Sequence, residues 1–227
     1  MKKLLITFII LIFTASCTST KKNSKVTTKK NQPLKAVKIK VIDKRYKNNP
    51  MVEAYDVNRD QKADMWKIYR EITENDQKIK VLKRREIDLN FDGKVNYYKF
   101  YTSKGNIEKE YIDIDLDGIV DKIRFYKDNS LVREEEYKKN PLNKDFTINK
   151  KIPPSKKIIY SNKKISRIII DRNGNGKLDE YLFFKNNKLI EIGFDEDYDE
   201  KIDIRIRPSK KTKKSKKIKE NSENEQK

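Results

Sequence analysis

The chain of 227 residues contains no histidine, a single cysteine, and only six glycines and six prolines. Without histidine, histidine general bases, catalytic triads and the usual zinc sites are excluded. One cysteine cannot form an internal disulfide. Neither a glycine-rich phosphate loop nor a GxSxG nucleophile motif occurs. These absences favour a protein that is not an enzyme. A carboxylate-dependent hydrolase of cell-wall glycans stays open, because acidic residues are abundant.

What the chain does contain is an acid-rich segment of nine residues, repeated five times in one register, with Asp or Asn at positions 1, 3, 5 and 9. The five sets are Asp56, Asn58, Asp60, Asp64; Asp88, Asn90, Asp92, Asn96; Asp113, Asp115, Asp117, Asp121; Asp171, Asn173, Asn175, Asp179; and Asp195, Asp197, Asp199, Asp203. Oxygen-bearing side chains at alternate positions of a tightly curled loop converge on one point, as a hard cation such as Ca²⁺ requires. The pattern therefore predicts at least one Ca²⁺ site.

The other positions of the loop refine this prediction. Position 6 must turn sharply, often with positive φ, which favours glycine; three loops have Gly93, Gly118 and Gly176 there, whereas Gln61 and Glu200 make the first and fifth loops weaker candidates. Position 7 offers its main-chain carbonyl, as Ile119 would in the third loop. Position 8 is apolar in every copy and is expected to anchor the loop to a core. Ligand charge tunes affinity, so the loops starting at Asp113 and Asp195, with four carboxylates each, rank first.

These nine residues resemble the DxDxDG calcium loops of EF-hands, dockerins, thrombospondin type 3 repeats and integrin-like propeller blades. An EF-hand would need a carboxylate at position 12, where this chain has Lys67, Lys99, Arg124, Leu182 and Ile206. The resemblance thus implies calcium binding in strand-flanked loops, without EF-hand helices and without a calmodulin-like opening. The alternative is that Asp, Asn and Gly simply form turns between strands, with no metal.

Short aromatic and β-branched runs follow four of the loops, at residues 65–69, 97–101, 122–126 and 180–184, and each is followed by a polar turn and a second run. Each unit is therefore predicted to be a hairpin led by an acidic loop. Residues 157–170 have the hairpin pattern without such a loop. We expect an all-β fold, an antiparallel meander of repeated β-hairpins, with curvature toward a partial propeller or a solenoid as an option.

The hairpins also resemble MORN-type and YwqK-like repeats of bacterial proteins, on the basis of strand composition and the turn at Gly105. This resemblance supports hairpins and implies nothing about activity. The aromatic residues of the runs are expected to pack on a common face of the sheet. The alternative is that they form an exposed binding ladder.

The N-terminus resembles a lipoprotein signal peptide, with two lysines, an apolar run over residues 4–13 and small residues before Cys17. That run is shorter than the ~20 apolar residues of a membrane span. Residues 14–17, TASC, resemble a bacterial lipobox in which Thr14 replaces the usual leucine. The resemblance implies a palmitate-type lipid on Cys17 and a cell-envelope location, at the outer membrane if the host is Gram-negative. The alternative is that Cys17 merely lies near a conventional cleavage site.

The net charge of +20 lies mostly in residues 18–50 and 208–227, so the part between them is close to neutral. We predict a signal peptide (1–16), a disordered basic tether (17–36), a hairpin-repeat domain (37–207) and a disordered Lys-rich tail (208–227). Expected partners are the membrane through the lipid, anionic lipid or a cell-wall polymer through the basic tails, and an unidentified protein. Nucleic acid is not an expected partner of an exported chain.

The leading hypothesis is a lipid-anchored, Ca²⁺-binding structural or binding module. The main alternative is a metal-free hairpin-repeat lipoprotein that binds a protein partner in an immunity-like or adhesion role.

Overall fold

The computed structural model describes residues 36–208, so the predictions for Cys17 and for both basic tails lie outside the described residues. Thirteen strands follow one another along these residues. They are β1 (Val37–Ile39), β2 (Val52–Asp56), β3 (Met65–Glu74), β4 (Gln77–Ile87), β5 (Tyr97–Tyr101), β6 (Ile107–Ile112), β7 (Lys122–Lys127), β8 (Ser130–Glu136), β9 (Lys156–Ser161), β10 (Lys164–Ile170), β11 (Glu180–Lys185), β12 (Lys188–Phe194) and β13 (Ile204–Ile206).

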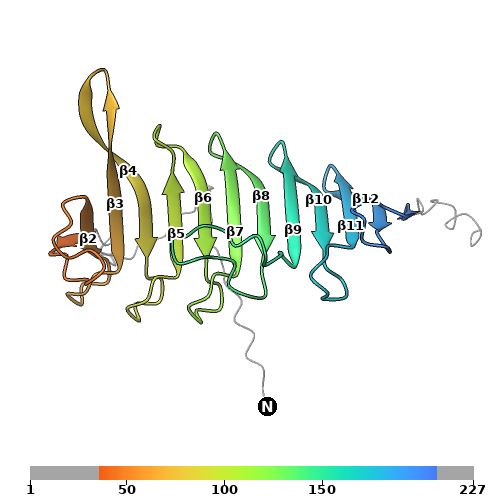
Figure 1. The fold of residues 1–227 in the computed structure, drawn as a ribbon, viewed down its shortest axis with the longest axis horizontal. Helices are drawn as coiled ribbons and strands as arrows, with labels where there is room; N and C mark the ends of the chain where they lie inside the picture. The colour runs from red at the N-terminus through yellow and green to blue at the C-terminus, as the bar shows by residue number, and fades with distance from the viewer. Residues whose placement is uncertain (1–35, 209–227) are drawn as a thin grey trace, which may run out of the picture. The chain divides into compact units, whose positions relative to one another are not determined.

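The strands form one antiparallel sheet in sequence order, so that each strand pairs with the strands before and after it (Figure 1). The predicted all-β meander of hairpins is therefore confirmed. The sheet does not close: among residues 36–208, β1 pairs only with β2, and β13 pairs only with β12. No helix in this part of the chain is long and apolar enough to cross a membrane.

Two kinds of connection alternate along the sheet and lie at opposite edges (Figure 1). At one edge, four two-residue turns have both central residues at φ between 48° and 62°, namely Asn75-Asp76, Asp128-Asn129, Asn162-Lys163 and Asn186-Asn187. Such turns match the twist of the flanking strands and favour Asn and Asp, which tolerate the left-handed region. The five acidic loops lie at the other edge, called here the loop edge.

One face of the sheet, called here the ladder face, is defined by a continuous row of cross-strand neighbours. The row consists of Glu53, Lys67, Arg85, Lys99, Glu110, Arg124, Glu134, Ile158, Ile168, Leu182, Ile192 and Ile206. It is charged from β2 to β8 and aliphatic from β9 to β13. Neighbours in the charged part are of opposite sign, which stabilises a sheet, except for Lys67, Arg85 and Lys99, which are consecutive positive charges. The acids are also bonded by tyrosines: Glu110 accepts the hydroxyls of Tyr97 at 2.6 Å and Tyr126 at 2.8 Å.

The opposite face, called here the core face, is defined by the row Ala54, Trp66, Glu86, Tyr98, Tyr111, Ile123, Glu135, Lys157, Ile169, Tyr181, Gly193 and Arg205. Both hydrophobic clusters lie here. The N-terminal cluster contains Val52, Ala54, Trp66 and Ile68, and the central cluster contains Phe100, Tyr111, Val120, Ile123 and Tyr137. Trp66, Tyr98 and Phe100 share this packed face as predicted, whereas Tyr97 and Tyr126 bond Glu110 on the ladder face, so the prediction holds for only part of the aromatic residues.

Two non-strand segments cover the core face. Val41 and Tyr46 from the β1–β2 connection pack on the N-terminal cluster. The β8–β9 connection crosses β5 to β8 (Figure 1) and covers the central cluster with Leu142, Phe146 and Ile148, where the Phe146 ring lies 5.1 Å from that of Tyr98. No comparable segment lies over β9 to β13, where no apolar side chain is buried among the described residues.

Candidate metal centre

The five acidic loops form one connected row along the loop edge. The N–H of position 1 donates to the carbonyl of position 9 in the preceding loop at three junctions: Asp88 to Asp64 (2.8 Å), Asp113 to Asn96 (2.9 Å) and Asp195 to Asp179 (3.0 Å). Between the third and fourth loops the β8–β9 connection takes this place, because Tyr137 donates to Asp121 and Asp171 donates to Ser155. The loops are therefore fixed relative to their neighbours by the sheet itself.

All five loops have the same backbone conformation. Position 6 has positive φ in every copy, including Gln61 (71°) and Glu200 (69°), which replace the favoured glycine. Position 4 is also left-handed, at Arg59, Phe91, Leu116, Gly174 and Tyr198. Sequence reasoning missed position 4, because only one copy has a glycine there and the other residues carry no local signal for this conformation. Lack of glycine at position 6 therefore does not change the backbone of the first and fifth loops.

The side chains at positions 1 and 9 hold this backbone. The carboxylate at position 1 accepts the N–H of position 6 in all five loops, for example Gly118 N to Asp113 Oδ2 at 2.8 Å. The side-chain oxygen at position 9 accepts the N–H of position 2, for example Ile114 N to Asp121 Oδ2 at 2.7 Å. These bonds need no metal, so they account for part of the repeat as turn chemistry.

Turn chemistry leaves one oxygen of the third loop unexplained. In the loops starting at Asp56, Asp88 and Asp171, the Oδ1 atom of position 1 accepts the N–H of position 4 at 2.5 Å to 2.7 Å. The corresponding Asp113 Oδ1 is buried and has no hydrogen-bond partner among the described residues, in a side chain that is only 3% exposed. A buried carboxylate oxygen without a donor is costly. A bound cation would satisfy it.

The same loop brings three carboxylates together. Oxygen atoms of Asp113, Asp115 and Asp117 lie within 4.8 Å of one another. Burial raises the pKa of Asp121 above its ordinary value, and the charges of Asp115 and Asp113 raise it further. The clustered negative charges therefore repel one another, and a cation at their centre would relieve that repulsion.

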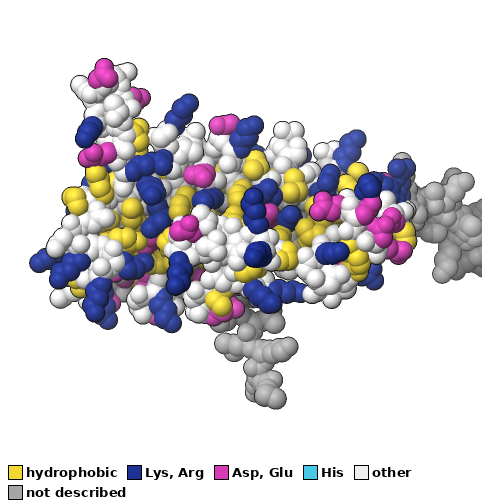
Figure 2. Space-filling model, in the orientation of Figure 1, with side chains coloured by type: hydrophobic (Ala, Val, Ile, Leu, Met, Phe, Trp, Pro, Cys, Tyr) yellow, Lys and Arg dark blue, Asp and Glu magenta, His cyan; other side chains and the backbone are white. Residues whose placement is uncertain are grey.

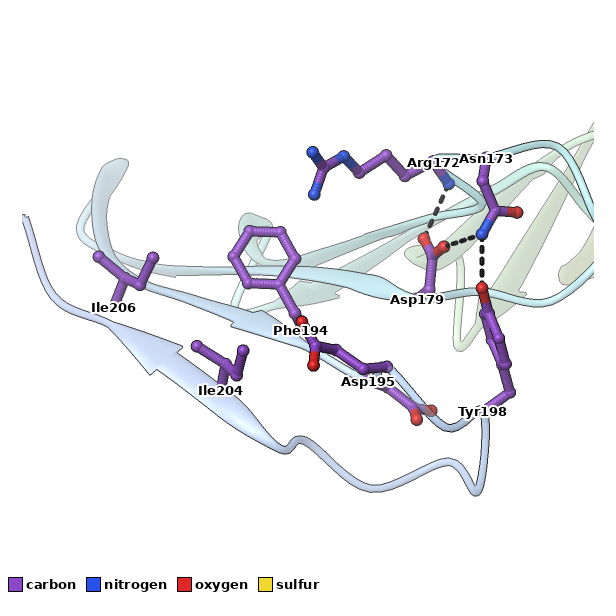
Figure 3. A pocket seen from close by; sticks show the side chains of 9 residues that line it. Arg172, Asn173, Asp179, Phe194, Asp195, Tyr198, Ile204 and Ile206 are labelled. Atoms are coloured by element: carbon purple, nitrogen blue, oxygen red, sulfur yellow. Dashed lines mark hydrogen bonds between the residues drawn. The ribbon is translucent and has the colours of Figure 1, made fainter.

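A second cluster lies in the fifth loop, where oxygens of Asp195, Asp197 and Asp203 also come within 4.8 Å. The fourth acid of this loop, Asp199, instead accepts the ammonium of Lys201 at 2.5 Å. A pocket of about 610 Å³ adjoins this loop, and Figure 3 shows Asp195 and Tyr198 among its lining residues. In its wall, Asn173 Nδ2 donates both to Asp179 Oδ2 at 2.9 Å and to the Tyr198 hydroxyl at 2.7 Å, which ties the fourth loop to the fifth.

Two clusters could thus hold a metal ion, and they belong to the two loops that carry four carboxylates. The three carboxylates of the loop starting at Asp56 do not converge among the described residues, and the loops starting at Asp88 and Asp171 have only two carboxylates each. Their position-1 carboxylates are saturated by backbone N–H groups. For these three loops the hydrogen bonds are those of the alternative, a metal-free turn, and Ca²⁺ binding by them stays a prediction.

The apolar residue at position 8 anchors the loops as expected. Val120 belongs to the central cluster, and Ala63 and Val95 pack against the N-terminal cluster. Ile202 of the fifth loop lies over Gly193 so closely that a Cβ at that glycine would meet Ile202 Cγ2 at 2.8 Å. Four of the five loops are therefore held to the sheet by this side chain as well as by their neighbours.

Comparisons with known proteins identify no family: no protein-family model and no curated protein sequence matches this chain. A crystal structure of a mutant of S. aureus TarM in complex with fondaparinux, alpha-GlcNAc-glycerol and UDP is similar over 54% of this chain and 21% of that chain, at 15% identity and a TM-score of 0.32. The match spans only about a fifth of that protein, and likeness at this level carries no argument about function. The predicted absence of enzymatic activity stays a prediction.

Proposed function

We propose that this chain is a lipid-anchored protein of the cell envelope whose β-hairpin sheet binds Ca²⁺ in its acidic loops and serves as a structural or binding module. The observation that supports the proposal most strongly is the third loop. It combines three converging carboxylates with a buried Asp113 oxygen that lacks a donor. The anchor and the location rest on the sequence around Cys17.

The chemistry of the third loop suits Ca²⁺ better than other common cations. All candidate ligands are oxygens, which excludes the soft-ligand sites of zinc and copper. Ca²⁺ takes six to eight oxygen ligands in variable geometry, whereas Mg²⁺ demands a near-ideal octahedron and retains several waters. Asp113, Asp115 and Asp117, together with the Ile119 carbonyl and waters, would provide such a set. Sites of extracellular modules bind in the millimolar range, so a partly exposed loop suffices.

Thermal unfolding of the mature chain, residues 17–227 with Cys17→Ser to prevent lipidation, tests the proposal. Calcium at about ten times its Kd stabilises a protein by about 1.4 kcal/mol. For a domain of this size that corresponds to a rise in Tm of about 3–6 °C. The rise should occur in millimolar Ca²⁺ and be absent in EGTA or with equal Mg²⁺.

A matched pair of variants separates metal binding from turn chemistry. Asp115→Ala/Asp117→Ala removes two clustered ligands, and Asn90→Ala/Asp92→Ala makes the same change at positions 3 and 5 of a loop without a cluster. Asp117 and Asp92 each accept the N–H two residues later, at 2.7 Å and 2.8 Å. In EGTA the first pair loses a similar turn bond but also relieves the repulsion within the cluster, so its Tm should fall no further than that of the second pair. Only the first pair should abolish the calcium-dependent rise. Equal calcium responses in the two variants would contradict the proposal.

The second candidate is a metal-free hairpin-repeat lipoprotein that binds a protein partner. It is favoured by the aliphatic part of the ladder-face row, where Ile206 is exposed and Ile158, Ile168, Leu182 and Ile192 are only partly buried. Uncovered apolar surface of this kind is typical of interaction sites. Identical melting curves in Ca²⁺ and EGTA would favour this candidate over the first.

A further inference from the structure

The second and third acidic loops carry large apolar side chains that point into solvent. Leu89 and Phe91 in the second loop are 52% and 47% exposed, and Ile114 and Ile119 in the third are 54% and 38% exposed. These two loops are neighbours, because the Asp113 N–H donates to the Asn96 carbonyl. Loop starts two strands apart in a sheet are separated by roughly 10 Å. The four side chains therefore lie on two adjoining loops of the loop edge, and they are together called here the apolar tip.

The apolar tip is not a general property of the repeat. At positions 2 and 4, where the second loop has Leu89 and Phe91, the fourth loop has Arg172 and Gly174. At position 7, where the third loop has Ile119, every other loop has a lysine, at Lys62, Lys94, Lys177 and Lys201. Turn formation does not require these apolar residues, since the other loops have the same backbone without them. Exposed apolar groups of this kind indicate a binding surface.

We propose that the apolar tip docks onto an anionic phospholipid surface when the third loop holds Ca²⁺. The calcium dependence rests on the function proposed above. Without the cation, the exposed carboxylates of Asp115 and Asp117 would face the negative surface of the bilayer and be repelled. With it, the loop is neutralised, and because three carboxylates do not fill the six to eight positions of Ca²⁺, lipid phosphate oxygens can complete its coordination.

The path of the chain favours a membrane as the occupant. The first residue of β1, Val37, pairs with Asp56, the first residue of an acidic loop, so the chain enters the sheet at the loop edge. The segment from Cys17 to Ala36 spans at most about 65 Å. A lipid on Cys17 would keep the sheet within that distance of the bilayer, with the loop edge as the point of attachment, so that a weak contact acts at a high effective concentration. Figure 2 shows Lys and Arg side chains along this edge, which suits an anionic surface, with hydrophobic and acidic side chains among them.

Vesicle binding by the mature, unlipidated chain tests this inference. All described strands lie within residues 37–206, so omission of the signal segment leaves the sheet complete. Co-sedimentation with phosphatidylglycerol/phosphatidylcholine vesicles should increase in Ca²⁺ over EGTA and over Mg²⁺. High salt should be present throughout, because it screens contacts of the Lys-rich tails with the same vesicles.

Two loop variants and one control locate the contact. Leu89→Ser/Phe91→Ser/Ile114→Ser removes apolar surface and should weaken vesicle binding by roughly tenfold or more. Ile119→Asn removes an apolar side chain without adding a positive charge that the anionic surface would attract, and it should weaken binding with the fold unchanged. Leu189→Ser/Ile190→Ser removes side chains that are 37% and 46% exposed near the opposite edge and should leave binding unchanged.

Each result separates this inference from the proposed function. A calcium-specific rise in Tm without calcium-dependent vesicle binding would leave the metal site standing and overturn the docking. Loss of both the rise and the binding would overturn both. Binding that persists in EGTA, or that both loop variants retain, would assign the contact to the basic tails and overturn docking through the loops.

Discussion

The strands β2 to β8 and the strands β9 to β13 repeat the same hairpin but are stabilised differently. In the first group the core face is covered by the β1–β2 and β8–β9 connections, and acids such as Glu86 and Glu110 are buried with charged and tyrosine partners. In the second group no apolar side chain is buried among the described residues. Since a hairpin cannot bury its own face, the comparison teaches that the stability of each unit depends on what covers it.

The ladder-face row shows the same difference on the other side of the sheet. From Glu53 to Glu134 every member of the row is charged, and from Ile158 to Ile206 every member is aliphatic. Hydrogen bonds from Lys38, Tyr55 and Tyr69 lower the pKa of Glu53 to about 2. Charged ladders suit a solvent-facing sheet, whereas an aliphatic row suits a covered one. The second group therefore has its apolar row on a face that the described residues leave uncovered.

The largest expected effect tests the difference in stability between the covered and the uncovered strands on the core face. Ile123 and Ile169 lie in one row of cross-strand neighbours, but Ile123 is fully buried in the central cluster and Ile169 is only partly buried. Ile123→Ala should lower the free energy of unfolding by about 2–5 kcal/mol, and Ile169→Ala by about 1 kcal/mol. Chemical denaturation, with amide hydrogen exchange to resolve the two regions, measures both.

Similar losses for the two isoleucine variants would refute the claim that coverage by the β8–β9 connection decides local stability. Trp66, the only tryptophan, lies in the N-terminal cluster, so its fluorescence reports on the covered region alone. Hydrogen exchange is needed for the uncovered strands, because repeat sheets can open in parts.

A smaller effect concerns the charged ladder. The side chain of Glu110 is 5% exposed and accepts two tyrosine hydroxyls and the Lys99 ammonium. Glu110→Ala leaves all three groups without their partner and should cost about 2–4 kcal/mol. The control is Glu191→Ala on β12, whose partners Arg205 and Arg207 are largely exposed, and which should cost much less. Denaturant midpoints of the two variants provide the measurement.

The same acid gives the pH dependence a definite sign. Burial alone would raise the pKa of Glu110, but hydrogen bonds from Tyr97, Tyr126 and Lys99 outweigh it, so the pKa lies below its ordinary value. The folded state therefore favours the charged form. This contribution is fully present above the unfolded pKa of about 4.3 and is lost as the pH falls through the folded value. The loss of unfolding free energy below about pH 4 should therefore be smaller in Glu110→Ala than in the unmodified protein, as measured by denaturation at a series of pH values. An equal loss in the two proteins would show that Glu110 is not one of the groups responsible.

Much of the fold could be predicted from local sequence, because it depends on local signals. Strand β5 was predicted at its observed bounds, since an acidic loop and a polar turn bracket an aromatic run. The sequence also ranks first the two loops with four carboxylates each, and these are the two loops in which three carboxylates converge. Alternating oxygens in a curled loop are a short-range pattern, which a single sequence can display.

What the sequence does not display is contact between distant segments. Nothing in the β8–β9 connection marks Phe146 as the residue that packs on Tyr98, because this contact depends on the path of the connection across β5 to β8. The alignment of the ladder-face row depends on β-bulges that recur before Tyr69, Tyr101, Tyr126 and Phe184. A bulge shifts register without a residue type of its own. The free Asp113 oxygen likewise follows from the three-dimensional fold of one loop.

The smallest expected effect comes from a variant that extends the charged row of the ladder face into the strands β9 to β13. Ile168 and Leu182 are direct cross-strand partners in the aliphatic part of the row, and both are only partly buried. Ile168→Glu/Leu182→Lys replaces them with a pair like Glu110 and Lys99. If this face is open to solvent, the loss of apolar contact is partly offset by the new pair, and the free energy of unfolding should change by less than about 1 kcal/mol. A loss of several kcal/mol would instead mean that the row is covered in solution. A simultaneous fall in molecular mass by light scattering would identify a second copy as the cover, and an unchanged mass would identify another part of the same chain. In that case the aliphatic residues form a buried interface. The two strand groups would then differ in which segment covers them: connections of the same sheet for β2 to β8, and another segment or a second copy for β9 to β13.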